Sequence, residues 1–218
     1  DVNGGVRNTV FENNVAGATS AMYVKGSIGG DFDNVTMKNN SSANDTNTVS
    51  GGGLYVGGDF AGSIVTSLFQ GNSGGGNYSS AVRVVGAITG DIRDTKFIEN
   101  SSTFSTSFGG GLDATTIDGK IEGCHFEGNK TTSYGGGVHA WKIGGGVFDS
   151  TFVDNVATGG IVSGGGGIGV SNTGLYGGIW NSTFTGNTVG SQGGAVMVLA
   201  NGINGGIHES TFKHHTVP

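Results

Sequence analysis

Short stretches in which apolar and polar residues alternate recur along the whole chain. In each, two apolar residues flank a position that varies freely, as Leu54 and Val56 flank Tyr55, or Val138 and Ala140 flank His139. Such alternation predicts a β-strand with one buried face. No stretch repeats its apolar residues with the period of a helix, and glycine at the density found here disfavours helix. The pattern therefore predicts an all-β protein.

A longer motif, F-x-x-N, groups these stretches into eight repeats of 26–32 residues. Its first position is aromatic in all repeats but one: Phe11, Met37, Phe69, Phe97, Phe126, Phe152, Phe184 and Phe212. Its last position is asparagine, with His215 instead in the eighth repeat: Asn14, Asn40, Asn72, Asn100, Asn129, Asn155 and Asn187. Equivalent residues of stacked strands lie above one another. The first column predicts an aromatic stack in the core, and the second predicts a ladder of hydrogen-bonded amides along the axis.

We call the first position of each F-x-x-N motif its anchor. A glycine lies seven residues before each anchor: Gly4, Gly30, Gly62, Gly90, Gly119, Gly145, Gly177 and Gly205. An invariant glycine marks a bend in which the backbone needs a positive φ or approaches another backbone closely. Two residues before the anchor the chain carries a small residue, such as Cys124 or Ser150, which we expect to lie in a narrow part of the core.

The repeats form a larger unit. Phe11 and Phe126 are 115 residues apart, as are Phe97 and Phe212. We therefore interpret residues 1–218 as one domain built from two blocks of four repeats, about 1–115 and 116–218. Both ends fall within the pattern, so we expect the chain to be a fragment or unit of a longer repeat protein.

Each repeat contains three predicted strands separated by bends rich in glycine, serine or asparagine. Three short strands in 26–32 residues correspond to one rung of a parallel β-solenoid. Rungs stack roughly 4.8 Å apart, so about eight of them would form a rod roughly 40 Å long.

These motifs resemble the repeats of chlamydial polymorphic outer membrane proteins and related autotransporter passengers. Six repeats keep F-x-x-N, and "GGAV" at 193–196 matches the second motif of that family, GGA[ILV]. Most other repeats read "GGG" or "SA" at the second motif. The resemblance covers almost the whole chain. It implies a right-handed parallel β-helix that is exported, displayed at the cell surface and often adhesive.

Composition and charge exclude several classes of protein. The chain has 47 glycines among 218 residues but one proline and no Gly-X-Y period, so it is not collagen-like. Its regularly spaced apolar residues and low charge content are unlike disorder. The net charge of −6, with ten scattered basic residues, argues against a nucleic-acid partner. The single cysteine, Cys124, excludes an internal disulfide.

The sequence offers no convincing catalytic group. Polysaccharide-cleaving β-helices need carboxylates on neighbouring rungs, but in the column three residues before the anchor no two acids fall on adjacent repeats. The densest charged group, Asp91, Arg93 and Asp94, is interpreted as a solvated surface. We interpret Cys124 as a buried structural residue. We therefore expect no enzymatic activity and no catalytic residue.

The C-terminal end of the chain contains a candidate metal site. His208, His214 and His215 lie close together there, and imidazoles bind zinc or nickel well. However, His215 simply takes the place of a ladder asparagine, and acid-rich calcium loops are lacking. We expect no metal and no other cofactor.

Exposed aromatic residues give the best candidate binding surface. Tyr23 and Tyr55 occupy one outward column on adjacent repeats, and Phe148 and Trp180 occupy another. Stacked aromatic rings on a solenoid face could hold a sugar ring or a protein partner, although β-strand propensity alone also favours these residues.

The interpretation that combines these points is a non-enzymatic, extracellular or cell-surface protein. Its β-helix would be a stiff shaft or passenger with an adhesive or structural role, and its partners a host-cell receptor, a glycan or further rungs of its parent chain. Two alternatives stay open. The chain could be a filament subunit that stacks end to end on copies of itself through open strand edges, or a polysaccharide-acting enzyme.

Overall fold

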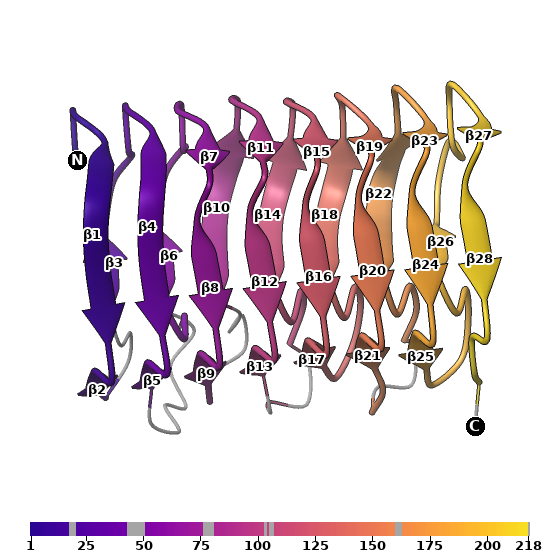
Figure 1. Cartoon of the computed structure of the whole chain (residues 1–218), viewed down its shortest axis with the longest axis horizontal. Coiled ribbons are helices and arrows are strands. Elements are labelled where there is room, and N and C mark those ends of the chain that lie inside the picture. Colours follow the sequence, from indigo (N-terminus) through magenta and orange to yellow (C-terminus); the bar gives the residue numbers. More distant parts are fainter. Residues whose placement is uncertain are drawn as a thin grey trace.

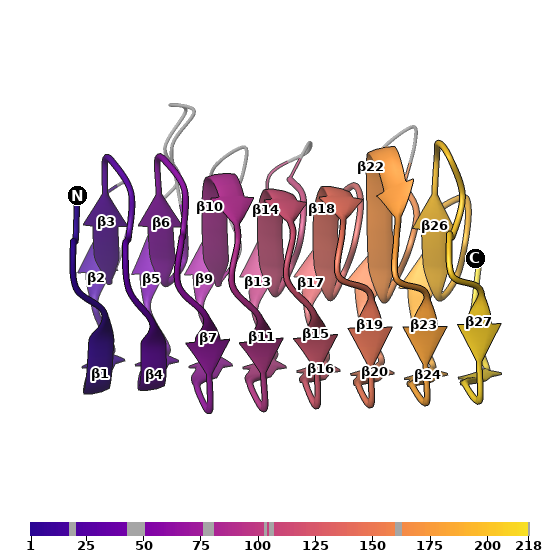
Figure 2. The same ribbon diagram turned by 90° about the horizontal axis from the view of Figure 1, so that it is seen from above.

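The computed structural model describes residues 1–17, 21–42, 51–75, 81–102, 104, 107–159 and 163–217. These residues contain no helix. Their 28 short strands form three parallel sheets that wrap around one core (Figure 1). The 14-stranded sheet and the seven-stranded sheet that contains β10 and β14 form separate rows when the molecule is seen from above (Figure 2).

The front sheet, which faces the viewer in Figure 1, has 14 strands. It begins with two long strands, β1 (Val6–Glu12) and β4 (Phe32–Lys38). Each later turn contributes two shorter strands to it: β7 (Ile64–Val65) and β8 (Leu68–Gln70), β11 (Ile92–Arg93) and β12 (Lys96–Ile98), β15 (Ile121–Glu122) and β16 (His125–Glu127), β19 (Val147–Phe148) and β20 (Thr151–Val153), β23 (Ile179–Trp180) and β24 (Thr183–Thr185), β27 (Ile207–His208) and β28 (Thr211–Lys213).

The other two sheets have seven strands each. The back sheet consists of β3 (Met22–Val24), β6 (Leu54–Val56), β10 (Val82–Ile88), β14 (Leu112–Ile117), β18 (Val138–Ile143), β22 (Ile168–Leu175) and β26 (Val196–Val198). The short sheet consists of β2 (Val15–Ala16), β5 (Ser41–Ser42), β9 (Ser73–Gly74), β13 (Ser101–Ser102), β17 (Lys130–Thr131), β21 (Val156–Ala157) and β25 (Thr188–Val189).

The coil is right-handed. In Figure 1 the front strands run downward, the back strands return upward behind them, and the chain advances to the right from its N-terminal end. The described chain passes eight times through the front sheet but only seven times through each of the others. The predicted right-handed parallel β-helix is therefore confirmed, with about seven complete turns rather than eight.

The register of the front sheet aligns the anchor residues of successive repeats. Phe97, for example, pairs with Phe69 on one side and Phe126 on the other. From Phe69 to Phe212 neighbouring rings stack with centroids 4.6–4.9 Å apart and planes within 8° of parallel. The anchors from Met37 to Phe184 are fully buried, so this stack forms the centre of the hydrophobic core.

The asparagine column forms a continuous ladder next to the short sheet. In each turn the backbone N–H of the asparagine donates to the side-chain Oδ1 of the next asparagine at 3.0–3.2 Å. Its Nδ2 donates to the same oxygen at 2.8–3.0 Å. From Asn40 onward, Nδ2 also donates to the anchor carbonyl of the preceding turn at 2.8–3.0 Å. The asparagines from Asn40 to Asn187 are fully buried, and each side chain from Asn40 to Asn155 ties together three consecutive turns.

The small residues before the anchors form a second ladder. The backbone N–H of Cys124 donates to the hydroxyl of Ser150, and that of Ser150 donates to the hydroxyl of Ser182, at 3.1 and 3.2 Å. Where the following residue of this column is serine or threonine, its hydroxyl accepts the backbone N–H of the residue before it in the column. The Cys124 thiol is only 2% exposed, and burial is the main cause that raises its pKa to about 12.

A left-handed residue divides each pass through the front sheet. Three residues before every anchor φ lies between 46° and 62°: Asn8, Asn34, Thr66, Asp94, Gly123, Asp149, Asn181 and Glu209. Glycine, asparagine and aspartate tolerate this conformation best. The choice of residues in this column therefore reflects the backbone conformation.

The column of turn glycines is explained mainly by close approach between turns. Of its members only Gly177 and Gly205 have a positive φ, 77° and 97°. At Gly119 an added Cβ would lie 2.1 Å from the carbonyl oxygen of Gly90, whereas at Gly4 it would meet nothing within 4 Å. Contact with the preceding turn thus forbids a side chain at Gly119.

We expect Gly119→Ala to destabilise the β-helix by about 2 kcal/mol, because a methyl group forced against a backbone must push two turns apart. Gly4→Ala is the matched control and should leave the thermal unfolding midpoint nearly unchanged. Differential scanning calorimetry of both variants measures the difference. Equal midpoints for the two variants would show that close approach does not select the glycine.

Candidate functional site: a buried polar column on the back sheet

The central positions of the back-sheet strands form a column on the outer face of that sheet, which we call the outer column. It contains Tyr23, Tyr55, Arg83, Asp113, His139, Gly169 and Met197. The sequence pattern predicted strands with one buried face, but in the middle of this column the outer face is buried as well. Asp113 is completely buried and His139 is 2% exposed.

Aromatic residues from the connections that precede the back strands cover this part of the column. The Phe108 ring stacks on the His139 ring with centroids 4.8 Å apart, and Tyr134 stacks on Phe108 at 5.8 Å. The glycine-rich connections pass close to the sheet, since a Cβ on Gly169 would lie 2.8 Å from the backbone nitrogen of Gly135. Glycine in these connections therefore lets a second layer of chain lie over the strands.

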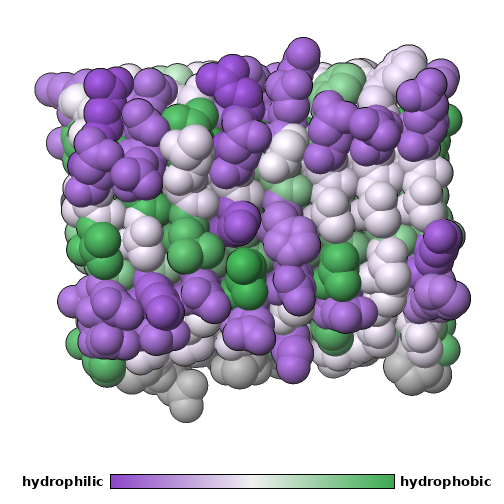
Figure 3. All heavy atoms as spheres, viewed as in Figure 1, coloured by the Kyte–Doolittle hydropathy of each residue, from purple (hydrophilic) through white to green (hydrophobic). Residues whose placement is uncertain are grey.

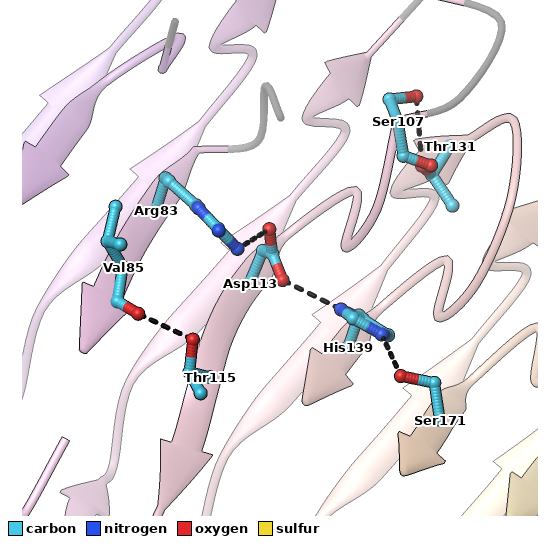
Figure 4. Close-up of polar contacts among 8 residues, drawn as sticks. All are labelled: Arg83, Val85, Ser107, Asp113, Thr115, Thr131, His139 and Ser171. Atoms are coloured by element: carbon cyan, nitrogen blue, oxygen red, sulfur yellow. Dashed lines mark hydrogen bonds and ion pairs between the residues drawn. The ribbon is translucent and has the colours of Figure 1, made fainter. Parts of the chain in front are cut away.

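Asp113 pairs with one basic group on each side. Arg83 Nη1 from β10 bonds to Oδ2, and His139 Nδ1 from β18 lies 2.7 Å from Oδ1 (Figure 4). Burial alone would raise the pKa of Asp113, but the Arg83 charge and the hydrogen bonds from His139 and Arg83 outweigh it, so the pKa lies below its ordinary value. The carboxylate is therefore held in its ionised form.

Ser171 extends the network to the next turn. Its Oγ lies 2.9 Å from His139 Nε2. It follows Val170, which is in register with Ala140 of β18, and the register resumes only at Gly174 opposite Lys142. Three residues of β22 thus face one residue of β18, and this bulge is where the partly buried Ser171 side chain turns toward His139.

The result is a linear arrangement of carboxylate, imidazole and hydroxyl on three successive turns, from β14, β18 and β22 (Figure 4). In this order an imidazole can accept the hydroxyl proton while the carboxylate orients and stabilises the imidazolium. Sequence reasoning missed the site because it searched the front-sheet columns and the C-terminal histidines. A signal for two members was present, since Asp113 and His139 occupy the same column in adjacent repeats; the bulge that brings in Ser171 left no such signal.

The predicted tyrosine pair lies at the N-terminal end of the same column. The Tyr23 and Tyr55 rings are 5.1 Å apart and within 6° of parallel. Tyr23 is 53% exposed, whereas Tyr55 is 9% exposed. Burial and then the neighbouring Tyr23 raise the pKa of Tyr55, against the opposing effect of Arg83. Only Tyr23 offers a ring face of substantial area to solvent.

The second aromatic pair lies on the front sheet, apart from the tyrosines. Phe148 and Trp180 are in register in β19 and β23. Trp180 stacks on His208 with centroids 3.7 Å apart, and Lys120 Nζ lies 5.0 Å from the centre of the Phe148 ring. Apolar groups on this side of the molecule are scattered among polar ones (Figure 3). The two predicted pairs therefore form separate patches.

The other candidate groups stay apart from this site. His215 occupies the ladder position next to Asn187, and burial is the main cause that lowers the pKa of its imidazole. Within the described residues no three His, Cys, Asp or Glu side chains are arranged to hold a metal ion. Nor does this part of the chain contain a helix long and apolar enough to span a membrane.

Taken together, the sheets and ladders define a parallel β-helix of the asparagine-ladder type. No family model matches the chain, and neither the curated proteins nor the solved structures include a match to it.

Proposed function

We propose that this chain is an extracellular, surface-displayed protein whose β-helix is a stiff shaft or passenger with an adhesive or structural role. The observation that carries the proposal is the unbroken asparagine ladder, in which each buried amide before the last links three consecutive turns. Continuous hydrogen bonding along the axis resists bending and local opening of the rungs. The resemblance of the F-x-x-N repeats to chlamydial polymorphic outer membrane proteins supports export.

An adhesive role would use the outer column at its N-terminal end. The exposed ring of Tyr23, backed by the parallel ring of Tyr55, is a flat apolar surface with a hydroxyl at its edge. Such a surface suits a sugar ring or an aromatic side chain. A glycan or a host-cell receptor is therefore the partner that we propose.

Antibodies raised against the purified chain test surface display when they are applied to intact and to permeabilised cells of the organism that makes it. We expect intact cells to be labelled. Labelling that requires permeabilisation would overturn the proposal. Adhesion is tested separately by binding of the chain to immobilised glycans and cultured cells, where Tyr23→Ala should weaken binding at least fivefold and Phe148→Ala, on the front sheet, should not.

The exposed edge residues favour one alternative, a filament subunit. At the last described turn Ile207 is 48% exposed and Phe212 is 38% exposed, although their equivalents from the second turn to the seventh are buried. The β1 strand of a second copy, or further rungs of a longer chain, could cover them by continuing the same columns. Electron microscopy of the chain over a concentration series should show fibres that Phe212→Lys abolishes if self-stacking occurs, and discrete rods if it does not.

A further inference from the structure

We propose that Ser171 is an activated nucleophile, with His139 as its general base and Asp113 as the residue that positions His139, and that it accepts acyl groups from small esters. This activity goes beyond the structural role proposed above and does not depend on it. Three features of the site carry the proposal: the geometry of the relay, its burial and the position of Ser171 on a bulge.

The relay has the geometry that nucleophile activation requires. The Asp113 Oδ1 to His139 Nδ1 and His139 Nε2 to Ser171 Oγ distances are 2.7 and 2.9 Å. Both lie within hydrogen-bond range, with the base oriented by a third group. Asp113 and His139 are almost completely buried, and Phe108 stacks against the imidazole. The imidazole is thus fixed in the orientation that points Nε2 at the hydroxyl.

Arg83 has two effects on this relay. Its guanidinium fixes the Asp113 carboxylate from the side opposite His139 and keeps it ionised. It also draws part of the carboxylate's charge away from the imidazole, which weakens the stabilisation of an imidazolium. We therefore expect acylation that is selective for Ser171 but slow compared with dedicated hydrolases.

A purely structural network explains only part of the arrangement. A buried Asp113 needs positively charged or hydrogen-bonding partners, and Arg83 and His139 supply them. Nε2 of the buried imidazole also needs a hydrogen-bond partner, but that need does not call for a partly exposed hydroxyl placed there by a bulge. Bulges commonly redirect side chains next to active sites.

The bulge also provides candidate donors for the oxyanion. Asn172 and Thr173 have no register partner in either β18 or β26, and Asn172 is exposed. Backbone N–H groups next to a nucleophile are common donors to the negative charge that develops on the acyl oxygen. The rings of Phe108 and Tyr134 stack against the His139 ring that contacts Ser171, so the acyl group in this proposal is a small one, such as acetyl.

The reaction balances with an ester and water as the only reactants. Ser171 Oγ attacks the acyl carbon, and its proton passes to His139 Nε2. The ester C–O bond breaks, and the leaving alcohol or phenol takes that proton. Water then attacks the acyl-serine with His139 again as base, which releases the carboxylic acid and regenerates Ser171.

The test treats the whole chain with p-nitrophenyl acetate and locates the acetyl group by peptide mass spectrometry. We expect acetylation of Ser171, a loss of at least 100-fold in its rate in His139→Gln, and no acetyl at this position in Ser171→Ala. Ser191→Ala is the matched control, because Ser191 is an exposed serine whose hydroxyl bonds to a backbone carbonyl. Failure of Ser171 to be acetylated in the wild-type chain would overturn the proposal.

A second measurement avoids variants that remove the buried network. In Ser171→Cys the thiol should react with iodoacetamide at pH 7 at least tenfold faster than the thiol of Ser191→Cys, because a neighbouring base increases its thiolate fraction. As the pH is lowered, the reaction rate of Ser171→Cys should begin to decline at a lower pH than the rate of Ser191→Cys. Equal rates and equal pH profiles would show that His139 does not activate this position.

Discussion

Replacing Asp113 with alanine should destabilise the β-helix by about 3–5 kcal/mol, because the change leaves the largely buried Arg83 and His139 side chains without the carboxylate that pairs with them. The Asp113 side chain is fully buried, and those of Arg83 and His139 are only 12% and 3% exposed. Without the carboxylate, the guanidinium would have to be desolvated with no counter-charge. Urea unfolding followed by circular dichroism measures the loss.

Asp118→Ala is the control for this variant. The Asp118 and Lys142 side chains are 43% and 37% exposed, and Nζ of Lys142 lies 3.1 Å from Oδ1 of Asp118. Exposed pairs contribute about 0–1 kcal/mol, so its removal should shift the urea midpoint little. An equally small effect at Asp113 would mean that the polar column does not hold the turns together.

The same carboxylate should make stability depend on pH. The pKa of Asp113 is lower in the folded chain than its ordinary value, so the folded state binds this proton less readily than the unfolded state does. The contribution is complete above the unfolded pKa of about 3.9 and is lost as the pH falls through the lower folded value. In Asp113→Asn this component of the acid destabilisation should be absent; a wild-type pH profile in that variant would contradict the assignment.

Replacing Asn129 with alanine should destabilise the β-helix by about 3 kcal/mol or more. Its Oδ1 accepts from both the backbone N–H and the Nδ2 of Asn100, and its own Nδ2 donates to the carbonyl of Phe97. The variant would leave these fully buried groups unsatisfied, at about 1–3 kcal/mol for each donor. Thermal and urea unfolding measure the change.

Asn14→Ala is the matched control, with the same chemical change at the edge of the ladder. Asn14 is exposed and its side chain only donates, to Oδ1 of Asn40, so the variant leaves no buried donor without an acceptor. Its effect should be about 1 kcal/mol or less. Similar losses at both positions would show that stacking of the asparagines in a buried ladder is not what stabilises the fold.

The fold could be predicted because each turn repeats the same physical requirements. Phe97 and Asn100 recur at fixed distances along the sequence, and in a β-helix a fixed distance becomes a position in a column. The left-handed position that divides each pass through the front sheet is a column rich in asparagine and aspartate in the sequence, for instance Asn34 and Asp94. Its meaning as a left-handed backbone position emerged only with the structure.

The candidate site could not be predicted, because it depends on residues outside the repeat. Phe108 and Tyr134, which bury the outer column, belong to connections whose length and sequence vary between turns. The approach of Ser171 to His139 depends on a bulge, and the columns of the repeat do not specify bulges. The division into two blocks of about 1–115 and 116–218 stays a prediction from the spacing.

The central claim is that equivalent side chains stack in unbroken ladders that make the chain a stiff shaft. Amide hydrogen exchange measured by NMR tests it most directly. We expect the backbone N–H groups of Asn72, Asn100, Asn129 and Asn155, together with their buried side-chain N–H groups, to exchange only through global unfolding and to share one free energy of opening. Exchange of these groups within minutes, or unequal values that divide the ladder into independently opening turns, would contradict the claim.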